Sequence, residues 1–140
     1  MVDRDLLLRK LADLEQYVAQ ASEYRALEVE QYRRDWRTQR IVDRTLQIAI
    51  ETCADIASHV ISDRGLRPPA TYADAFEVLG EAGLVDPSLL GSLVRMAKFR
   101  NVLVHEYARV DPEIVIRILR GNLGDLTAFC RAARGWVAGP

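Results

Sequence analysis

The sequence predicts an all-α protein that folds as an up-and-down bundle of four long helices and one short helix. Apolar residues recur at steps of three and four along most of the chain, which is the spacing of one face of an α-helix. Asp-Pro pairs and a capping-box-like segment mark the starts of helices between these stretches. No segment shows a convincing strand pattern, and the connections are short, as in antiparallel helical bundles.

The first three expected segments begin or end at recognisable signals. The first covers residues 3–33, and its contact face begins with apolar side chains at helical spacing: Leu7, Leu11, Leu14, Val18 and Ala21. The second starts after a plausible N-cap, Asp35, and ends near Ser62. The third is a short spacer that starts at Thr71, with a carboxylate three residues later, and ends at Gly83.

The last two segments each open on an Asp-Pro pair, which places an N-cap before a proline at the first helical position. They are expected to cover residues 86–107 and 111–134. We therefore expect one helical domain over residues 1–134, and a flexible C-terminal tail over residues 135–140.

The second helix carries more apolar surface than one contact face requires. One seam consists of Val42, Leu46, Ala49, Cys53, Ile56 and Val60. A second seam lies beside it: Ile50, Ala54, Ala57 and Ile61. So wide an arc indicates burial on two sides, and in a small bundle the second side is open to a subunit partner. The remaining face holds a polar stripe that either faces solvent or, where Glu51, Asp55 and His59 follow one another, lines a cleft: Arg44, Gln47, Glu51, Asp55, Ser58 and Ser62.

The fourth helix places an arginine where its pattern requires an apolar residue. The series is Leu89, Leu93, Met96, Arg100, Leu103 and Tyr107. A buried guanidinium is costly unless it is paired or lines a wet cleft. Arg100 is therefore either half of a structural ion pair with Glu51 or Asp55, or part of a functional cleft for a polyanion. Tyr107 differs from Arg100 by only about 20° around the axis, so the two are expected on one cleft face.

Three features favour a cleft that acts on RNA. Arginine binds phosphate oxygens in bidentate fashion, and His105, one turn above Asn101, is a residue type that exchanges protons near neutral pH. The stretch around them is locally basic because of Arg95, Lys98 and Arg109. RNA carries its own nucleophile, the 2′-hydroxyl, so cleavage needs a base and a cation but no metal. A symmetric dimer would bring two copies of each group together, although a lone histidine at a helix end is also common as a surface or capping residue.

Length and composition exclude several classes of protein. The 140 residues, 49% hydrophobic and 28% charged, predict one folded domain and exclude disorder. Cys53 and Cys130 are expected to be buried free thiols, and with two histidines and no CxxC we expect no metal site or cofactor. No apolar run reaches membrane-spanning length and no signal peptide is visible at the N-terminus, so we expect a cytoplasmic protein without membrane contact. The net charge of −1 argues against broad electrostatic capture of nucleic acid, but permits a local basic patch.

The segment RNVLVHEY, residues 100–107, matches the motif of HEPN-domain proteins: arginine, a polar residue, three variable positions, histidine, one variable position and tyrosine. Residues 40–62 resemble the second helix of the HepT branch of that superfamily, and residues 69–79 with 98–107 resemble its core. The resemblance covers roughly residues 1–134.

The resemblance implies an all-α homodimer, or a higher homo-oligomer, with the motif helices at a shared cleft. Similar proteins are toxins of type II toxin–antitoxin modules that act as metal-independent ribonucleases. Their partner is a minimal nucleotidyltransferase antitoxin that silences them by AMP transfer to the motif tyrosine. On this basis Arg100 and His105 would be catalytic, Asn101 would support them, and Tyr107 would be modified. From spacing we add Glu51 and Asp55 as supporting residues, and Arg95, Lys98 and Arg109 as RNA contacts.

Two other interpretations remain open. In the first, the chain is a non-catalytic subunit that binds nucleotide or a nucleotidyltransferase partner through the same residues. In the second, it is a helical dimer in which arginine–carboxylate pairs only set the register, which a fully buried Arg100 would favour.

Overall fold

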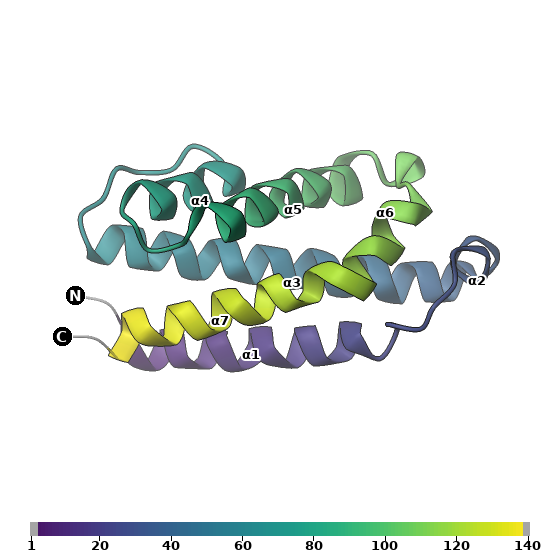
Figure 1. The fold of residues 1–140 in the computed structure, drawn as a ribbon, viewed down its shortest axis with the longest axis horizontal. Coiled ribbons are helices and arrows are strands. Elements are labelled where there is room, and N and C mark those ends of the chain that lie inside the picture. Colours follow the sequence, from purple (N-terminus) through teal and green to yellow (C-terminus); the bar gives the residue numbers. More distant parts are fainter. Residues whose placement is uncertain (1–2, 139–140) are drawn as a thin grey trace.

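The computed structural model describes residues 3–138 and is an all-helical bundle (Figure 1). Its long helix α3 runs the length of the molecule, with α4 and α5 along one side and α1 and α7 along the other. The start of α1 and the end of α7 lie at the same end of the bundle. The elements are α1 (Arg4–Ser22), α2 (Val29–Arg34), α3 (Trp36–Asp63), α4 (Tyr72–Glu81), α5 (Pro87–His105), the 3-10 turn η1 (Tyr107–Arg109), α6 (Pro112–Arg117), the π-helical turn η2 (Ile118–Asn122) and α7 (Leu123–Ala138).

The expected single helix over residues 3–33 is wrong, because the chain leaves the helix after Ser22 and restarts as α2. The seam that begins at Leu7 would continue near positions 25 and 28, which hold Arg25 and Glu28, so no apolar face remains to hold the helix on the core. Glu28 and Gln31 form a capping box that starts α2. The break carries Tyr32 to a buried position against α3.

Helix α3 starts where the sequence predicts, because the carboxylate of Asp35 accepts bonds from the backbone N–H groups of Arg37 (3.0 Å) and Thr38 (3.3 Å). Both apolar seams of this helix are buried within the single chain, where α3 packs against α1, α4, α5 and α7. The second seam is therefore not left open for a subunit partner. The chain's own helices supply the two-sided burial that the wide apolar arc requires.

Helix α4 begins at the predicted cap, with the N–H of Asp74 donating to the hydroxyl of Thr71 at 3.0 Å. Gly83 ends the segment in the left-handed region, at φ +73°, which a residue with a side chain adopts only under strain. Arg67 joins the preceding loop to both ends of α4 by hydrogen bonds to Asp74 (2.9 and 3.0 Å) and Glu81 (2.7 and 2.9 Å). This clamp holds the loop that leads into α4.

Helix α5 begins at Asp86-Pro87 as predicted but ends at His105, two residues earlier than expected. Glu106 leaves the helical region, with φ −139° and ψ 41°, and the chain continues as the 3-10 turn η1. Tyr107 is thus on a separate element, and the small angle expected between it and Arg100 does not apply. The helix ends early because the chain must turn before the next cap, Asp111.

The last expected segment consists of α6, η2 and α7, which follow one another without a loop, and α6 begins at the predicted Asp111 cap. The expected flexible tail is wrong for residues 135–138, which continue α7. Trp136 packs edge-on against Phe129, with 5.6 Å between ring centroids, and Val137 is buried, so apolar contacts extend the helix. Residues 139–140 of that tail lie outside the described residues.

Cys53 and Cys130 are buried free thiols, as the sequence predicts. Burial raises the pKa of both, that of Cys130 to about 11. In the part of the chain that the structure describes, no helix is long and apolar enough to cross a membrane.

Candidate functional site

Arg100 on α5 is tied to Glu51 on α3. Its Nε and Nη2 atoms each lie 2.8 Å from Oε2 of Glu51, which also accepts a bond from Gln47 at 3.0 Å. The side chains of Arg100 and Glu51 are 18% and 25% exposed, so the pair is mostly but not fully buried. A charge-assisted pair in this setting fixes the position of the guanidinium.

Tyr72 packs on the same guanidinium, with Cζ of Arg100 4.6 Å from the centre of its ring. The remaining Nη1 atom donates to the side-chain oxygen of Asn101 at 3.2 Å. These residues border a surface hollow of about 360 Å³, hereafter the Arg100 cleft, lined by Ser58, Pro69, Ala70, Thr71, Tyr72, Arg100 and Asn101. Arg100 is therefore both half of an ion pair and open to a cleft.

Asp55, which the sequence groups with Glu51, belongs to a different cluster. It forms a salt bridge with Lys10 of α1 and lies 3.7 Å from His59. A step of four residues rotates a side chain by about 40° around the helix, which is enough to turn Asp55 toward α1 and away from α5. The structure thus brings Glu51 and Asn101 to Arg100, and does not bring Asp55.

His105 is the last residue of α5 and is exposed. Within residues 3–138 its ring has no hydrogen-bond or ion-pair partner. It does not line the Arg100 cleft, nor a second, larger hollow that is described below. Five residues along a helix correspond to about 140° around its axis. One chain therefore does not bring His105 and Arg100 to a common point.

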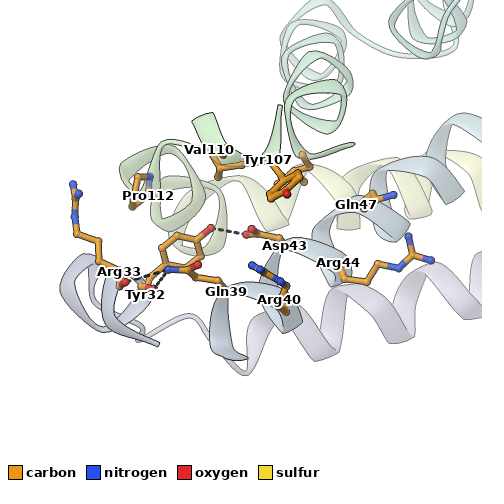
Figure 2. A pocket seen from close by; sticks show the side chains of 12 residues that line it. Tyr32, Arg33, Gln39, Arg40, Asp43, Arg44, Gln47, Tyr107, Val110 and Pro112 are labelled. Carbon is orange, nitrogen blue, oxygen red and sulfur yellow. Dashed lines mark hydrogen bonds between the residues drawn. The ribbon is translucent and has the colours of Figure 1, made fainter. Parts of the chain in front are cut away.

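Tyr107 is 69% exposed and lies at the mouth of a second, larger hollow (Figure 2). This α3–η1 groove has a volume of about 800 Å³ and is lined by Tyr32, Arg33, Gln39, Arg40, Asp43, Arg44, Gln47, Leu103, Tyr107, Ala108, Val110 and Pro112. Figure 2 shows Tyr107 on one side of the groove and Arg40, Asp43 and Arg44 of α3 on the other. The hydroxyl of Tyr107 makes no hydrogen bond to any described residue.

The groove's other tyrosine, Tyr32, has a hydroxyl that is already hydrogen-bonded. The Tyr32 hydroxyl donates to Oδ1 of Asp43 at 2.7 Å. Burial and this carboxylate raise the pKa of Tyr32 well above its ordinary value, and burial also raises the pKa of Asp43. The hydroxyl of Tyr32 is therefore neutral and engaged, whereas that of Tyr107 belongs to an exposed side chain and bonds to no described residue.

The basic residues predicted around Arg100 do not surround it. Arg95 and Lys98 line a separate hollow, next to Arg117. Arg109 extends from η1 and lies 3.9 Å from Glu106. The positive charge that lies near Tyr107 comes instead from Arg40 and Arg44.

Sequence reasoning assigned no role to Arg40 or Tyr72, and it placed Arg44 only in the polar stripe of the second expected helix. The signal for the arginines is the polar stripe of α3, since positions 40, 44, 47 and 51 follow one another at steps of four, three and four. Tyr72 follows the N-cap of α4 directly, so its position over Arg100 depends on how α4 packs on α5, which no local pattern encodes. Among residues 3–138, no three side chains of the metal-binding types gather into a possible metal site.

A family model described as Ribonuclease HepT-like matches residues 11–133. The chain is 27% identical to the mRNA nuclease HepT of Shewanella oneidensis, over 89% of this chain and 93% of that protein. It is 25% identical to the tRNA nuclease HepT of Aphanizomenon flos-aquae, over 86% of this chain and 82% of the relative.

Among solved structures, the fold is similar to that of a tri-AMPylated HEPN toxin from Shewanella oneidensis in complex with MNT antitoxin. The TM-score is 0.85 at 26% identity, with 96% of this chain and 99% of that chain covered.

Proposed function

Because the chain belongs to the Ribonuclease HepT-like family, we propose that it is an endoribonuclease toxin of a type II toxin–antitoxin module. Its site combines Arg100 and His105 across the cleft of a homodimer and needs no metal ion. A nucleotidyltransferase antitoxin silences it by transferring AMP to Tyr107. The observation that carries the proposal is a guanidinium held in place by Glu51 and Tyr72 beside an open cleft.

The proposed cleavage uses the RNA's own 2′-oxygen as the nucleophile. This oxygen attacks the adjacent phosphorus, the bond from phosphorus to the 5′-oxygen breaks, and a 2′,3′-cyclic phosphate and a 5′-hydroxyl remain. His105 takes or supplies the transferred proton, and Arg100 stabilises the charge on the phosphorane. The Arg100–Glu51 pair supports this role because a fixed guanidinium needs no reorganisation as the charge develops.

A dimer accounts for the separation of the two groups. Arg100 and His105 of one chain do not face a common point, so a two-fold axis near α5 would place the histidine of one protomer near the arginine of the other. Asn101 would hold the guanidinium from the exposed side.

The proposed silencing is a nucleotidyl transfer to an exposed hydroxyl. Oη of Tyr107 attacks the α-phosphorus of ATP, pyrophosphate leaves, and the phenolic proton passes to solvent. The product is a phosphodiester with one negative charge, attached to a side chain that is 69% exposed. A bulky anion at this position would compete with RNA for the basic groups nearby.

The test compares His105→Ala with His59→Ala, since these are the chain's two histidines. His105→Ala should lower RNA cleavage by about 10²–10⁴-fold and abolish growth inhibition, because a positioned acid or base contributes about that much. His59, which lies beside Asp55 on α3, is outside the proposed site, so His59→Ala should stay toxic. Full toxicity of His105→Ala would overturn the mechanism.

The second candidate is a non-catalytic binding subunit, which the isolated His105 favours. In that case the purified wild-type protein would bind nucleotide phosphate but leave RNA intact in the presence or absence of its partner.

A further inference from the structure

The α3–η1 groove has one cationic wall. Its lining includes three arginines and one aspartate: Arg33, Arg40, Arg44 and Asp43. Asp43 accepts the hydrogen bond of the buried Tyr32, and Arg33 lies 3.3 Å from Glu30. With Arg33 set against Glu30 and Asp43 set against one arginine, a surplus of one positive charge remains, which Arg40 and Arg44 share.

Neither of these two arginines is neutralised by an ion pair. Burial raises the pKa of the neighbouring Asp43 and Arg40 offsets only part of that rise, and no ion pair among residues 3–138 joins a carboxylate to Arg40 or Arg44. Both side chains are exposed and follow each other one helical turn apart along α3. Their spacing is suited to successive anionic groups or to two oxygens of one phosphate.

The opposite wall is apolar and aromatic. It consists of Leu103, Tyr107, Ala108, Val110 and Pro112. Figure 2 shows the Tyr107 side chain across the groove from Arg40. A cationic track that faces an aromatic ring is the arrangement by which proteins hold single-stranded nucleic acid, with phosphates on the basic side and bases on the ring. The groove, at about 800 Å³, is also within the size range of ligand pockets.

A chain of hydrogen bonds along α3 links a residue of the groove to a residue of the Arg100 cleft. Gln47 lines the groove and donates to Oε2 of Glu51, the same oxygen that holds Arg100. Arg40, Arg44, Gln47 and Glu51 therefore form one continuous polar track along α3. A strand that binds at Arg40 and Arg44 and continues along α3 would next meet the guanidinium of Arg100, which offsets the charge of Glu51.

We propose that the α3–η1 groove is a phosphodiester-binding subsite in which Arg40 and Arg44 bind phosphate groups and the ring of Tyr107 packs against a nucleoside. This inference rests on the proposed function and names the residues that hold its ligand. The phosphodiester has two possible sources with the same chemistry: an RNA strand that approaches Arg100, or the adenylyl group attached to Tyr107. In the second case the modification would fill the subsite that RNA needs.

The first experiment measures binding of a short fluorescein-labelled 2′-O-methyl RNA of mixed sequence, which lacks the nucleophilic hydroxyl and is not cleaved. Arg40→Gln and Arg44→Gln are compared with Arg131→Gln. Arg131 is an exposed arginine on α7, so this control substitution removes one positive charge outside the groove. Each groove variant should weaken binding by about 10-fold, as expected for one charge-assisted bond. The slope of log affinity against log salt should fall by about 0.7 for each phosphate group that the variant no longer neutralises.

The second experiment uses protein co-expressed with a minimal nucleotidyltransferase, in which intact mass reports the AMP groups on Tyr107. Arg40 and Arg44 should protect the attached phosphodiester, so a phosphodiesterase should release AMP about 10-fold faster from the groove variants than from wild type or Arg131→Gln. If co-expression adds no mass, the silencing part of the proposed function fails, and the RNA experiment alone decides the groove.

The outcomes separate the two sources. An effect on RNA binding alone assigns the subsite to the substrate strand, and an effect on AMP release alone assigns it to the adenylyl group. Equal behaviour of the groove variants and Arg131→Gln in both measurements overturns the inference, even where the wild-type protein cleaves RNA. Circular dichroism of each variant checks that the fold is retained.

Discussion

Arg100 and Glu51 meet through a single oxygen: Nε and Nη2 of the arginine both lie 2.8 Å from Oε2 of the glutamate. The contact joins α5 to α3 and orients the guanidinium with its Nη1 edge toward Asn101 and the cleft. The guanidinium is thus held by Glu51 on one side and borders the Arg100 cleft on the other.

Removing the carboxylate charge should therefore affect both stability and activity. Glu51→Gln leaves a mostly buried guanidinium with a weaker partner, which should cost about 1–3 kcal/mol of the free energy of unfolding. Urea denaturation measures this loss. Glu15→Gln is the matched control, because Glu15 forms an exposed pair with Arg134, and its loss should stay below about 1 kcal/mol. Equal free energies of unfolding for Glu51→Gln and wild type would show that the Arg100–Glu51 pair does not stabilise the fold.

A composite site predicts complementation between inactive chains. Arg100→Ala and His105→Ala should each be inactive alone, whereas a refolded mixture should recover part of the activity. In a mixed dimer, one of the two composite sites still contains an intact arginine from one chain and an intact histidine from the other. RNA cleavage measures the recovery, and light scattering should report a dimer at micromolar concentration. A monomer, or a mixture as inactive as its components, would contradict the composite site.

Local signals predicted the starts of helices well. Asp35, Thr71, Asp86 and Asp111 all cap the helices assigned to them, because a cap is a bond between a side chain and backbone two or three residues away. Helix ends were predicted less well. The break after Ser22 does have a local signal, since the apolar seam ends at Arg25 and Glu28, and Gln31 completes a capping box with Glu28. The early end of α5 at His105 has no such short-range signal.

The site was also predicted only in part, because local patterns indicate a residue's type of environment but not which neighbouring helix it faces. An arginine within an apolar seam indicated a buried or cleft-lining cation, and Glu51 was one of two candidate partners for it. The choice between Glu51 and Asp55 depends on the direction in which α1 and α5 lie around α3, and Lys10 on α1 takes Asp55. Tyr107 was placed on the wrong face, because its position follows from η1 and not from helical periodicity.

The proposed reaction predicts its products and its tolerance of chelators. Attack by the 2′-oxygen should leave a 2′,3′-cyclic phosphate and a 5′-hydroxyl, which mass spectrometry of a cleaved oligonucleotide identifies. The same oligonucleotide with a 2′-deoxy position at the cleavage site should resist cleavage, because it lacks the nucleophile. Activity should also survive EDTA. Products with 5′-phosphate ends, or strict dependence on a divalent ion, would point to a different mechanism.

The clamp at Arg67 predicts the acid sensitivity of the fold. Its hydrogen bonds hold the pKa of Asp74 at about 2, below the ordinary 3.8, and lower the pKa of Glu81 as well. A carboxylate with a lowered pKa stabilises the folded state fully above its ordinary value, and this contribution is lost as the pH falls through the folded value. The free energy of unfolding should therefore fall between about pH 4 and pH 2.

Asp74→Asn isolates this contribution. The variant should be less stable than wild type at neutral pH, and its stability should fall less steeply between about pH 4 and pH 2. Adding Arg67→Gln should cause little further loss from the Asp74 contact, since the partner is already absent. Urea denaturation across this pH range measures both. An unchanged acid slope in Asp74→Asn would show that the carboxylate does not carry the effect.

Control at Tyr107 predicts that toxicity and rescue separate when one hydroxyl is removed. The side chain is 69% exposed on η1 and its hydroxyl bonds to no described residue, so Tyr107→Phe should fold and remain toxic. It should not be rescued by co-expression with a nucleotidyltransferase, because no oxygen remains to attack the α-phosphorus of ATP. Tyr32→Phe is the control within the same groove, since its hydroxyl is engaged by Asp43 and should not accept AMP. Growth assays with intact mass spectrometry should show added AMP on wild type and Tyr32→Phe and none on Tyr107→Phe. If Tyr107→Phe is rescued as fully as wild type without a gain in mass, the partner silences the toxin by covering the cleft and not by modifying it.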